Sequence, residues 1–240
     1  MKAEKIGAEI RRITHCQVLW DKFSRDFYSV DASSYLVKPL VIVFPRNEKE
    51  IIKILRFASK KNISVTPRGA GTGLVGSALG RGIILDLKNF NKIKVYPNYV
   101  QAESGVLRGT LDKRLEKDGK FFGPDPSVGP YCTIGGMIAT NASGSHSLKY
   151  GSVIDNLIGV RIITSSGKAI NLPAKSRFAN KILKMINRNI QKKFPDVSKN
   201  SCGYRLDKIR KKTDLQKIIA GSEGTLGIIV SAKLKILPLP

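Results

Sequence analysis

The first third of the chain alternates short apolar runs with one amphipathic stretch. Residues 41–44 are all apolar, and residues 51–58 place apolar side chains along one stripe of a helix. Asn47 suits the N-cap of that helix, with Glu50 as the reciprocal partner in a capping box. Residues 63–65 form the next expected strand. Two strands joined by a helix are expected to run parallel, with a right-handed crossover.

After residue 80 the pattern changes to mainly strands. The expected strands cover residues 82–87, 95–96, 100–103, 158–164, 168–172 and 227–237. The expected helices run from a cap at Thr110 to Gly119, over residues 178–193 and near residues 214–219. This order predicts an α+β fold, with a small β-α-β subdomain at about 31–95 packed on a larger one at about 96–240. The larger subdomain is expected to hold a mixed or antiparallel sheet with flanking helices.

Composition indicates a soluble globular protein. The 240 residues are 42% hydrophobic and 25% charged, which is enough to bury a core. No run of about 18 apolar residues is present, and the charged first 20 residues lack the core of a signal peptide. Cys16, Cys132 and Cys202 are far apart and form no C-x-x-C pair. That spacing argues against a disulfide framework or a zinc site, and predicts buried, inert thiols in a reducing cytoplasm.

The charge of the chain is strongly positive. Forty-two Lys and Arg residues against 18 Asp and Glu give a formal net charge of +24, which attracts polyanions. The basic residues are nevertheless spread along the sequence, and no zinc finger, RNA-binding signature or basic heptad accompanies them. A solvated basic surface, a phosphate-bearing ligand or an acidic partner is therefore favoured over direct nucleic-acid binding.

A glycine-rich loop is the first candidate site. Residues 66–76 read TPRGAGTGLVG and contain the spacing G-x-G-x-x-G. A Rossmann loop needs a helix to begin there, but residues 77–82 (SALGRG) would break one, and a strand follows. The glycines instead allow consecutive amides to point at one anion, with charge from Arg68 and a hydroxyl from Thr72. The alternative is a mobile surface turn.

Two further glycine-rich segments change that balance. They are residues 123–151, which contain GPDPS, TIGGMIATNASG and KYG, and residues 221–227, which read GSEGTLG. From about Asp31 to Pro240 the chain resembles the FAD-binding domain of the vanillyl-alcohol oxidase / p-cresol methylhydroxylase (PCMH-type) flavoprotein family. Within that family it is most similar to the FAD subunits of D-lactate dehydrogenase and glycolate oxidase. The matching motifs PRGAGTGL, PDPS, TIGGMIATNASG, KYG, CGYRL and GSEGTLGII occur in the family's order.

The resemblance implies which residues contact FAD. The loop expected at the diphosphate comprises Pro67, Arg68, Gly69, Ala70, Gly71, Thr72, Gly73 and Leu74. The segment expected along the flavin and phosphates runs from Asp125 to Thr133, together with Pro124, Gly135 and Gly136. On the other side of the cofactor the resemblance places Thr140, Asn141, Ala142, Ser143 and Gly144, followed by Tyr150 and Gly151. The adenosine side is assigned to Gly221, Glu223, Gly224, Gly227, Ile228 and Ile229.

FAD is expected to be bound non-covalently. Some family members tether the flavin through a histidine or cysteine, but His15 and His146 both lie outside the first loop, where the usual histidine tether sits. His146 falls near the flavin by analogy. A surface or hydrogen-bonding role is favoured for it.

The resemblance implies an oxidoreductase that oxidises a small D-2-hydroxy acid, of the lactate or glycolate type, by hydride transfer to FAD. Longer relatives continue into a cap domain that carries the catalytic or metal-binding histidines and the substrate-gripping arginines. We therefore assign no catalytic residue and no metal site here, and expect a partner chain to supply the cap. The alternatives are a flavin-binding protein without its own activity and a basic, nucleic-acid-associated protein. The resemblance does not identify the electron acceptor. The expected location is the cytoplasm, and peripheral contact with the inner membrane face is the alternative.

Overall fold

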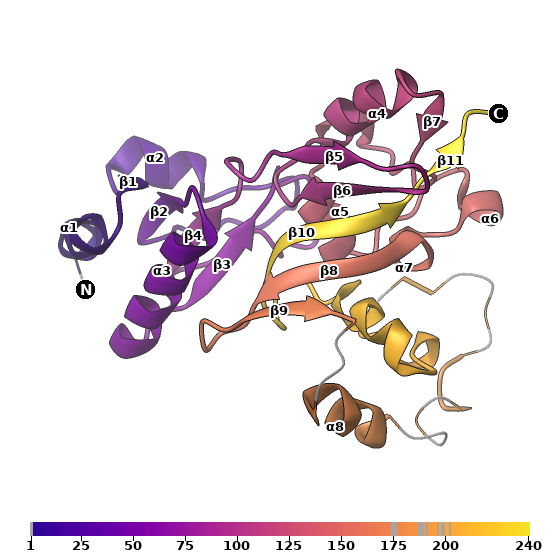
Figure 1. Cartoon of the computed structure of the whole chain (residues 1–240). Coiled ribbons are helices and arrows are strands. Elements are labelled where there is room, and N and C mark those ends of the chain that lie inside the picture. The colour runs from indigo at the N-terminus through magenta and orange to yellow at the C-terminus, as the bar shows by residue number, and fades with distance from the viewer. Residues whose placement is uncertain are drawn as a thin grey trace.

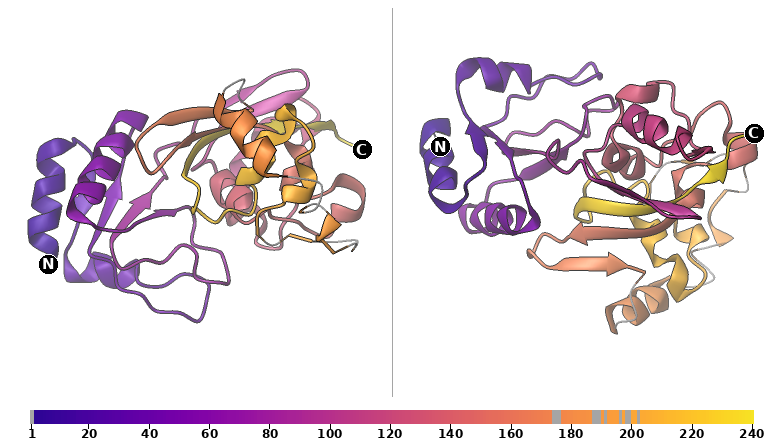
Figure 2. Two further views of the ribbon diagram at one scale, coloured as in Figure 1. Left: turned by 90° about the horizontal axis from the view of Figure 1, so that it is seen from below. Right: turned by 45° about the horizontal axis from the view of Figure 1, so that its top comes forward.

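Two sheets organise the chain, and they lie side by side with the termini at opposite ends (Figures 1 and 2). The structure is a computed structural model that describes residues 2–173, 177–186, 190, 192–195, 197, 200–201 and 203–240. Within these residues the arrangement confirms the predicted α+β class.

The first sheet has the strand order β1-β2-β4-β3. Its strands are β1 (Gln17–Leu19), β2 (Val41–Phe44), β3 (Val65–Arg68) and β4 (Ile83–Asp86). The strands β2 and β3 are parallel as predicted, but β4 lies between them and pairs with both. The short β1 adds an antiparallel edge to β2. The local sequence pattern predicts that two strands joined by a helix run parallel. It does not predict that β4, which follows them in the chain, lies between β2 and β3 in the sheet.

Helices cover both faces of this sheet. Val41 and Val43 of β2 pack in one core with α1 (Ala3–Ile13) and α3 (Glu48–Lys61), while Ile42 and Phe44 face a smaller cluster next to α2 (Lys22–Phe27). Because side chains alternate across a strand, an entirely apolar strand is expected where both faces are covered. The four apolar residues of β2 are accordingly all buried.

The second sheet is antiparallel, with the order β5-β6-β10-β8-β9. Its strands are β5 (Ile93–Val95), β6 (Tyr99–Glu103), β8 (Leu157–Ile163), β9 (Ala169–Leu172) and β10 (Ile228–Lys235). One face packs against α4 (Arg108–Glu116), α5 (Ile134–Ala139), α7 (Val153–Asn156) and the 3₁₀ helix η3 (Lys212–Ile219). A two-stranded ribbon of β7 (Lys120–Phe121) and β11 (Leu237–Pro238) lies beside it.

Shorter elements complete the described part of the chain. They are the 3₁₀ turn η1 (Gly129–Tyr131), α6 (Ser147–Tyr150), α8 (Arg177–Met185) and the 3₁₀ turn η2 (Leu206–Lys208). The helix expected over 178–193 is described as helical to Met185, and its residues 187–189 and 191 lie outside the described residues. None of the helices in the described ranges is long and apolar enough to cross a membrane.

The two sheets share contacts at their junction. Ile163, Ile228 and Val230 of the second sheet belong to the same buried cluster as the core of the first sheet. On the surface, the Arg161 guanidinium of β8 binds the Glu48 carboxylate of α3 through two contacts, at 2.5 and 2.7 Å. These contacts fix the position of one sheet against the other.

One helix start and one capping contact differ from the sequence prediction. The helix predicted to begin at Thr110 is capped at Leu107, because the Arg108 amide already donates to the Cys132 carbonyl at 2.8 Å. At α3 the Asn47 side chain accepts from the Glu50 amide as expected, but Glu50 does not return to the Asn47 amide. Its carboxylate accepts instead from the amides of Arg46 and His15.

The Asn47 cap can be tested directly. We expect Asn47→Ala to destabilise the protein by about 1 kcal/mol, because an orphan amide at the start of α3 loses its acceptor. Urea unfolding would measure the change. The matched control is Lys49→Ala, an exposed position in the first turn of the same helix. An equal loss in both variants would contradict the capping role.

Candidate functional site

A cavity of about 610 Å³ opens where the three glycine-rich segments meet. The end of β3 and the loop after it form one wall, residues 126–142 a second, and residues 223–229 a third. Leu87 and Ser104, which follow β4 and β6, also line it. Segments far apart in the sequence therefore contribute to one concave site, of the size that cofactor sites usually have.

The glycine loop enters this cavity without a helix. Among the described residues, β3 is followed by irregular backbone until β4 begins at Ile83. Gly71 and Gly76 have φ of +70° and +76°, a conformation that favours glycine. The Gly71 carbonyl accepts from the Ala32 amide at 2.9 Å, so the segment around residue 32 supports the loop. The prediction that G-x-G-x-x-G here does not begin a helix is confirmed.

The first and second segments touch at Gly69. A side-chain carbon on Gly69 would lie 2.2 Å from Thr133 Oγ1, so the two backbones approach closely because residue 69 has no side chain. Thr133 is itself fixed, because its Oγ1 accepts from the Gly136 amide at 3.2 Å and caps α5. The position of the second segment thus depends on a glycine of the first.

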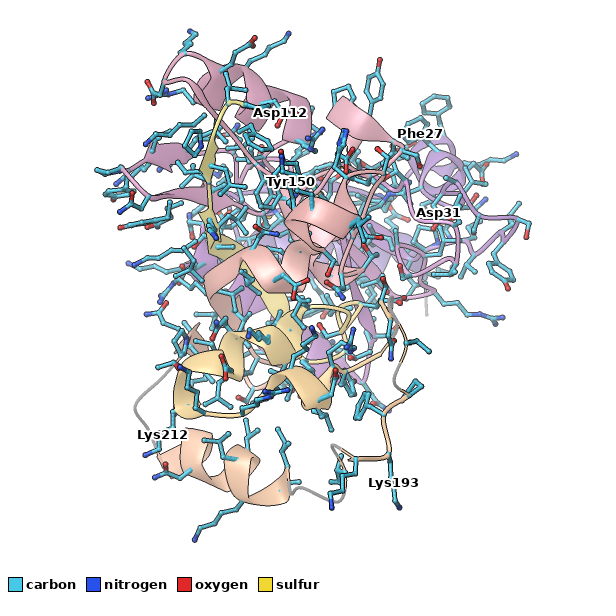
Figure 3. The ribbon with its side chains drawn as sticks, turned by 90° about the vertical axis from the view of Figure 1, so that its right-hand side faces the viewer. Phe27, Asp31, Asp112, Tyr150, Lys193 and Lys212 are labelled. Carbon is cyan, nitrogen blue, oxygen red and sulfur yellow. The ribbon has the colours of Figure 1, made fainter. Side chains whose placement is uncertain are left out.

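Arg68 lines the cavity from a buried position, with 8% of its surface exposed. Its Nη2 donates to the Val30 carbonyl at 2.9 Å, and its guanidinium lies 5.0 Å from the ring centroid of Tyr28. The Tyr28 hydroxyl donates to Asp86 Oδ2 at 2.6 Å. Burial lowers the pKa of Arg68 and raises that of Tyr28. Figure 3 shows Phe27 and Asp31, from the N-terminal segment that holds Arg68, on the same edge of the molecule.

Asp125 organises the loop beside the cavity. Its carboxylate accepts from Ser145 Oγ at 2.8 Å and from the His146 amide at 3.1 Å, and His146 Nδ1 lies 2.5 Å from it. Burial acts to raise the pKa of Asp125, but the hydrogen bonds from Ser145 and His146 outweigh it, and the pKa lies below its usual value. Asp125 therefore carries a negative charge at neutral pH and binds residues 144–146 in place.

Many of the predicted contact residues meet in the cavity. Those that line it are Pro67, Arg68, Gly69, Ala70, Gly71, Thr72, Gly73, Leu74, Thr133, Gly135, Gly136, Thr140, Ala142, Glu223, Gly224, Gly227 and Ile229. Those that lie outside its lining are Pro124, Asp125, Asn141, Ser143, Gly144, Tyr150, Gly151, Gly221 and Ile228. Some of the outer set support the site: fully buried Asn141, at φ +47°, accepts from the Ile154 amide through Oδ1 at 3.0 Å.

Sequence reasoning missed several lining residues. They include Leu87, Ser104, Met137 and Ser201, whereas Val128 and Cys132 lie within the segment 125–133 that was expected along the cofactor. Cys132 and Cys16 are both buried, and burial raises the pKa of each thiol, whereas Cys202 lies outside the described residues. Within the described ranges, no group of three or more His, Cys, Asp or Glu side chains could hold a metal ion.

The family described as "FAD binding domain" matches residues 39–173, which is more than half of the chain. The chain belongs to this FAD-binding family. FAD is therefore the cofactor of the domain, and the resemblance seen in the sequence is confirmed.

Named relatives of the FAD-binding domain are dehydrogenases and oxidases. It is 35% identical to D-2-hydroxyglutarate dehydrogenase of Escherichia coli, aligning over 88% of this chain and 24% of that protein. It is 33% identical to D-lactate dehydrogenase of Anaerostipes hadrus, over 92% of this chain and 41% of the relative. Glycolate oxidase subunit GlcD of Bacillus subtilis is 32% identical, over 89% and 40%. This chain thus spans less than half the length of these relatives.

A solved structure confirms the fold of the domain. An alkyldihydroxyacetonephosphate synthase superimposes with a TM-score of 0.70 and 26% identity, over 93% of this chain and 38% of that one. The predicted arrangement, a β-α-β unit against an antiparallel sheet with flanking helices, is the arrangement found here.

The residues present in the cavity fit a dinucleotide. Arg68 Nη1 and Ser104 Oγ are buried and have no hydrogen-bond partner in the described part of the chain, so two polar groups are left to a ligand. A side-chain carbon on Gly73 would find only Ser77 Oγ, at 3.7 Å, which leaves bare backbone facing the cavity. Free donors and exposed main chain are what phosphate groups require.

Proposed function

We propose that the chain is the FAD-binding part of an oxidoreductase that oxidises a small D-2-hydroxy acid. The observation that carries this proposal is the single cavity built by three glycine-rich segments, in a chain 32–35% identical to enzymes named for D-2-hydroxyglutarate, D-lactate and glycolate. The shared chemistry of those names is a hydroxyl next to a carboxylate. Bound FAD supplies the hydride acceptor for that hydroxyl carbon.

The residues of this chain would bind and orient the cofactor. We propose that the main chain of residues 69–73 and the Arg68 side chain hold the diphosphate, and that Thr133, Gly135 and Gly136 lie along the cofactor. Residues 223–229 would take the adenosine side. We propose that FAD binds non-covalently. The His146 side chain, the histidine nearest the flavin by analogy, contacts Asp125 and is 68% exposed, which does not favour a covalent tether.

A cap is proposed from outside these 240 residues. The named relatives are about two and a half to four times as long as the part of them that this chain matches. We propose two subdomains, at about 31–95 and 96–240, to the first of which α1, β1 and α2 also contribute. We further propose a partner chain or further domain that binds the substrate carboxylate. A cytoplasmic location and docking of the basic surface on an acidic partner or the inner membrane face belong to the same proposal.

The experiment is anaerobic reduction of the purified protein, followed by flavin absorbance. D-lactate, glycolate and D-2-hydroxyglutarate are added separately, with and without the product of the neighbouring reading frame. Bleaching that requires the second chain supports the proposal. A yellow protein that no donor reduces favours a flavin-binding protein without its own activity. A colourless protein that binds DNA with a steep salt dependence favours the nucleic-acid alternative.

A further inference from the structure

Ser104 is buried in the cavity wall directly after β6, with 1% of its surface exposed. Its backbone is fully used, because its amide donates to the Val230 carbonyl at 2.9 Å and its carbonyl accepts from the Gly135 amide at 2.8 Å. Its hydroxyl has no partner in the described ranges of the chain. Hydroxyl groups buried in this way normally have one, so the side chain is arranged for a ligand.

Ser104 lies on the same wall as Arg68. The Arg68 carbonyl accepts from the Leu87 amide at 3.2 Å, and a side-chain carbon on Gly105 would lie 2.1 Å from the Leu87 carbonyl oxygen. The ends of β3, β4 and β6 are therefore neighbours. Arg68 Nη1 is the other polar group of the cavity left without a partner among the described residues. A cation and a hydroxyl donor thus line the cavity beside the bare backbone of the glycine loop.

We infer that the Ser104 hydroxyl donates a hydrogen bond to the diphosphate of the bound dinucleotide. Arg68 supplies charge, the loop after β3 supplies amides, and Ser104 supplies a neutral donor from the second sheet. Hydrogen bonds to charged acceptors are the stronger ones, so an anionic phosphate oxygen is a better partner than a ring atom. The inference rests on the proposed placement of FAD and adds a residue that no glycine motif contains.

The test is Ser104→Ala, with two readouts besides activity. Titration of the apo protein with FAD should show binding weakened by about tenfold, the usual effect of losing one charge-assisted hydrogen bond. The ³¹P resonances of bound FAD should shift relative to wild type. The melting temperature of the apo variant should not fall, because the lost hydroxyl has no partner in the unliganded protein.

Ser231→Ala is the matched control. Ser231 is 9% exposed, lies opposite Glu103 in the β6–β10 ladder and does not line this cavity. Its variant should keep the wild-type FAD affinity and the wild-type ³¹P spectrum.

Three results would overturn the inference. The first is unchanged FAD affinity in Ser104→Ala. The second is weaker affinity with an unchanged ³¹P spectrum, which would place the contact elsewhere on the cofactor. The third is a fall in the melting temperature of the apo protein that accounts for the weaker binding. Failure of the wild-type protein to bind FAD would instead reject the proposed function.

Discussion

Replacing Gly69 by alanine should weaken FAD binding by about 3 kcal/mol, or about a hundredfold, while most of the fold survives. The added carbon would lie 2.2 Å from Thr133 Oγ1, far inside van der Waals contact. Thr133 must then rotate, which removes the cap of α5 and displaces Gly135 and Gly136 from the cavity wall. Fluorescence titration of apo protein with FAD measures the loss, and circular dichroism checks that the helices persist.

A double variant distinguishes this steric cause from a general disturbance. Thr133→Ala removes Oγ1. The side-chain carbon added at residue 69 would then lie 3.3 Å from the Cβ of residue 133. Gly69→Ala should consequently cost much less in the Thr133→Ala background than in wild type. Additive losses in the double variant would show that contact between residues 69 and 133 is not responsible, because residues that interact directly give non-additive effects.

Phe122→Ala should destabilise the protein by about 3–5 kcal/mol, the range typical of a truncated core aromatic. Phe122 is 1% exposed, directly precedes the Gly123–Ser127 segment and packs in the core beneath the second sheet. Since whole domains are stable by only about 5–15 kcal/mol, this single change removes a large share of the stability. Urea unfolding of the apo protein measures it.

Phe23→Ala is the control for Phe122→Ala. Phe23 is 81% exposed, so the same truncation should change the unfolding free energy by less than about 0.5 kcal/mol. Saturating FAD should stabilise the Phe122 variant by linkage if the cavity still forms. If Phe122→Ala lowers the unfolding free energy no more than Phe23→Ala does, the core against the second sheet tolerates a large void, contrary to its close packing.

Local pattern predicted the parts of the site that consist of glycine. The loop at residues 69–76 was identified because several closely spaced glycines have few uses other than positive φ or close approach, and the structure shows both. Asn47 was identified for a similar reason, since its role is to cap the next residues in the chain. Turn glycines and helix caps depend on interactions between residues that are close in the sequence, so the sequence alone can predict them.

The remaining parts depend on contacts between distant residues. Ser104 is one serine between Glu103 and Gly105, and its place in the cavity wall arises only when the Gly135 amide, from a distant segment of the chain, donates to its carbonyl. The start of α4 was misplaced because Leu107 bridges to Thr133, and the Arg108 amide finds a carbonyl 24 residues away in sequence. Similarly, nothing near β2 or β3 indicates that β4 will lie between them.

The strand β10 has a consequence for the order of folding. It is the middle strand of the second sheet, yet Ile228 and Val230 complete the buried cluster of the first sheet, and Ile229 lines the cavity between them. Neither core is complete until β10 pairs with strands whose partner residues precede its own by 65 to 136 positions. Contacts so distant in sequence slow folding, because a long loop must close before they can form. On the ribosome, most of the chain must therefore be synthesised before either half can become stable, and the cofactor can bind only after both have closed together.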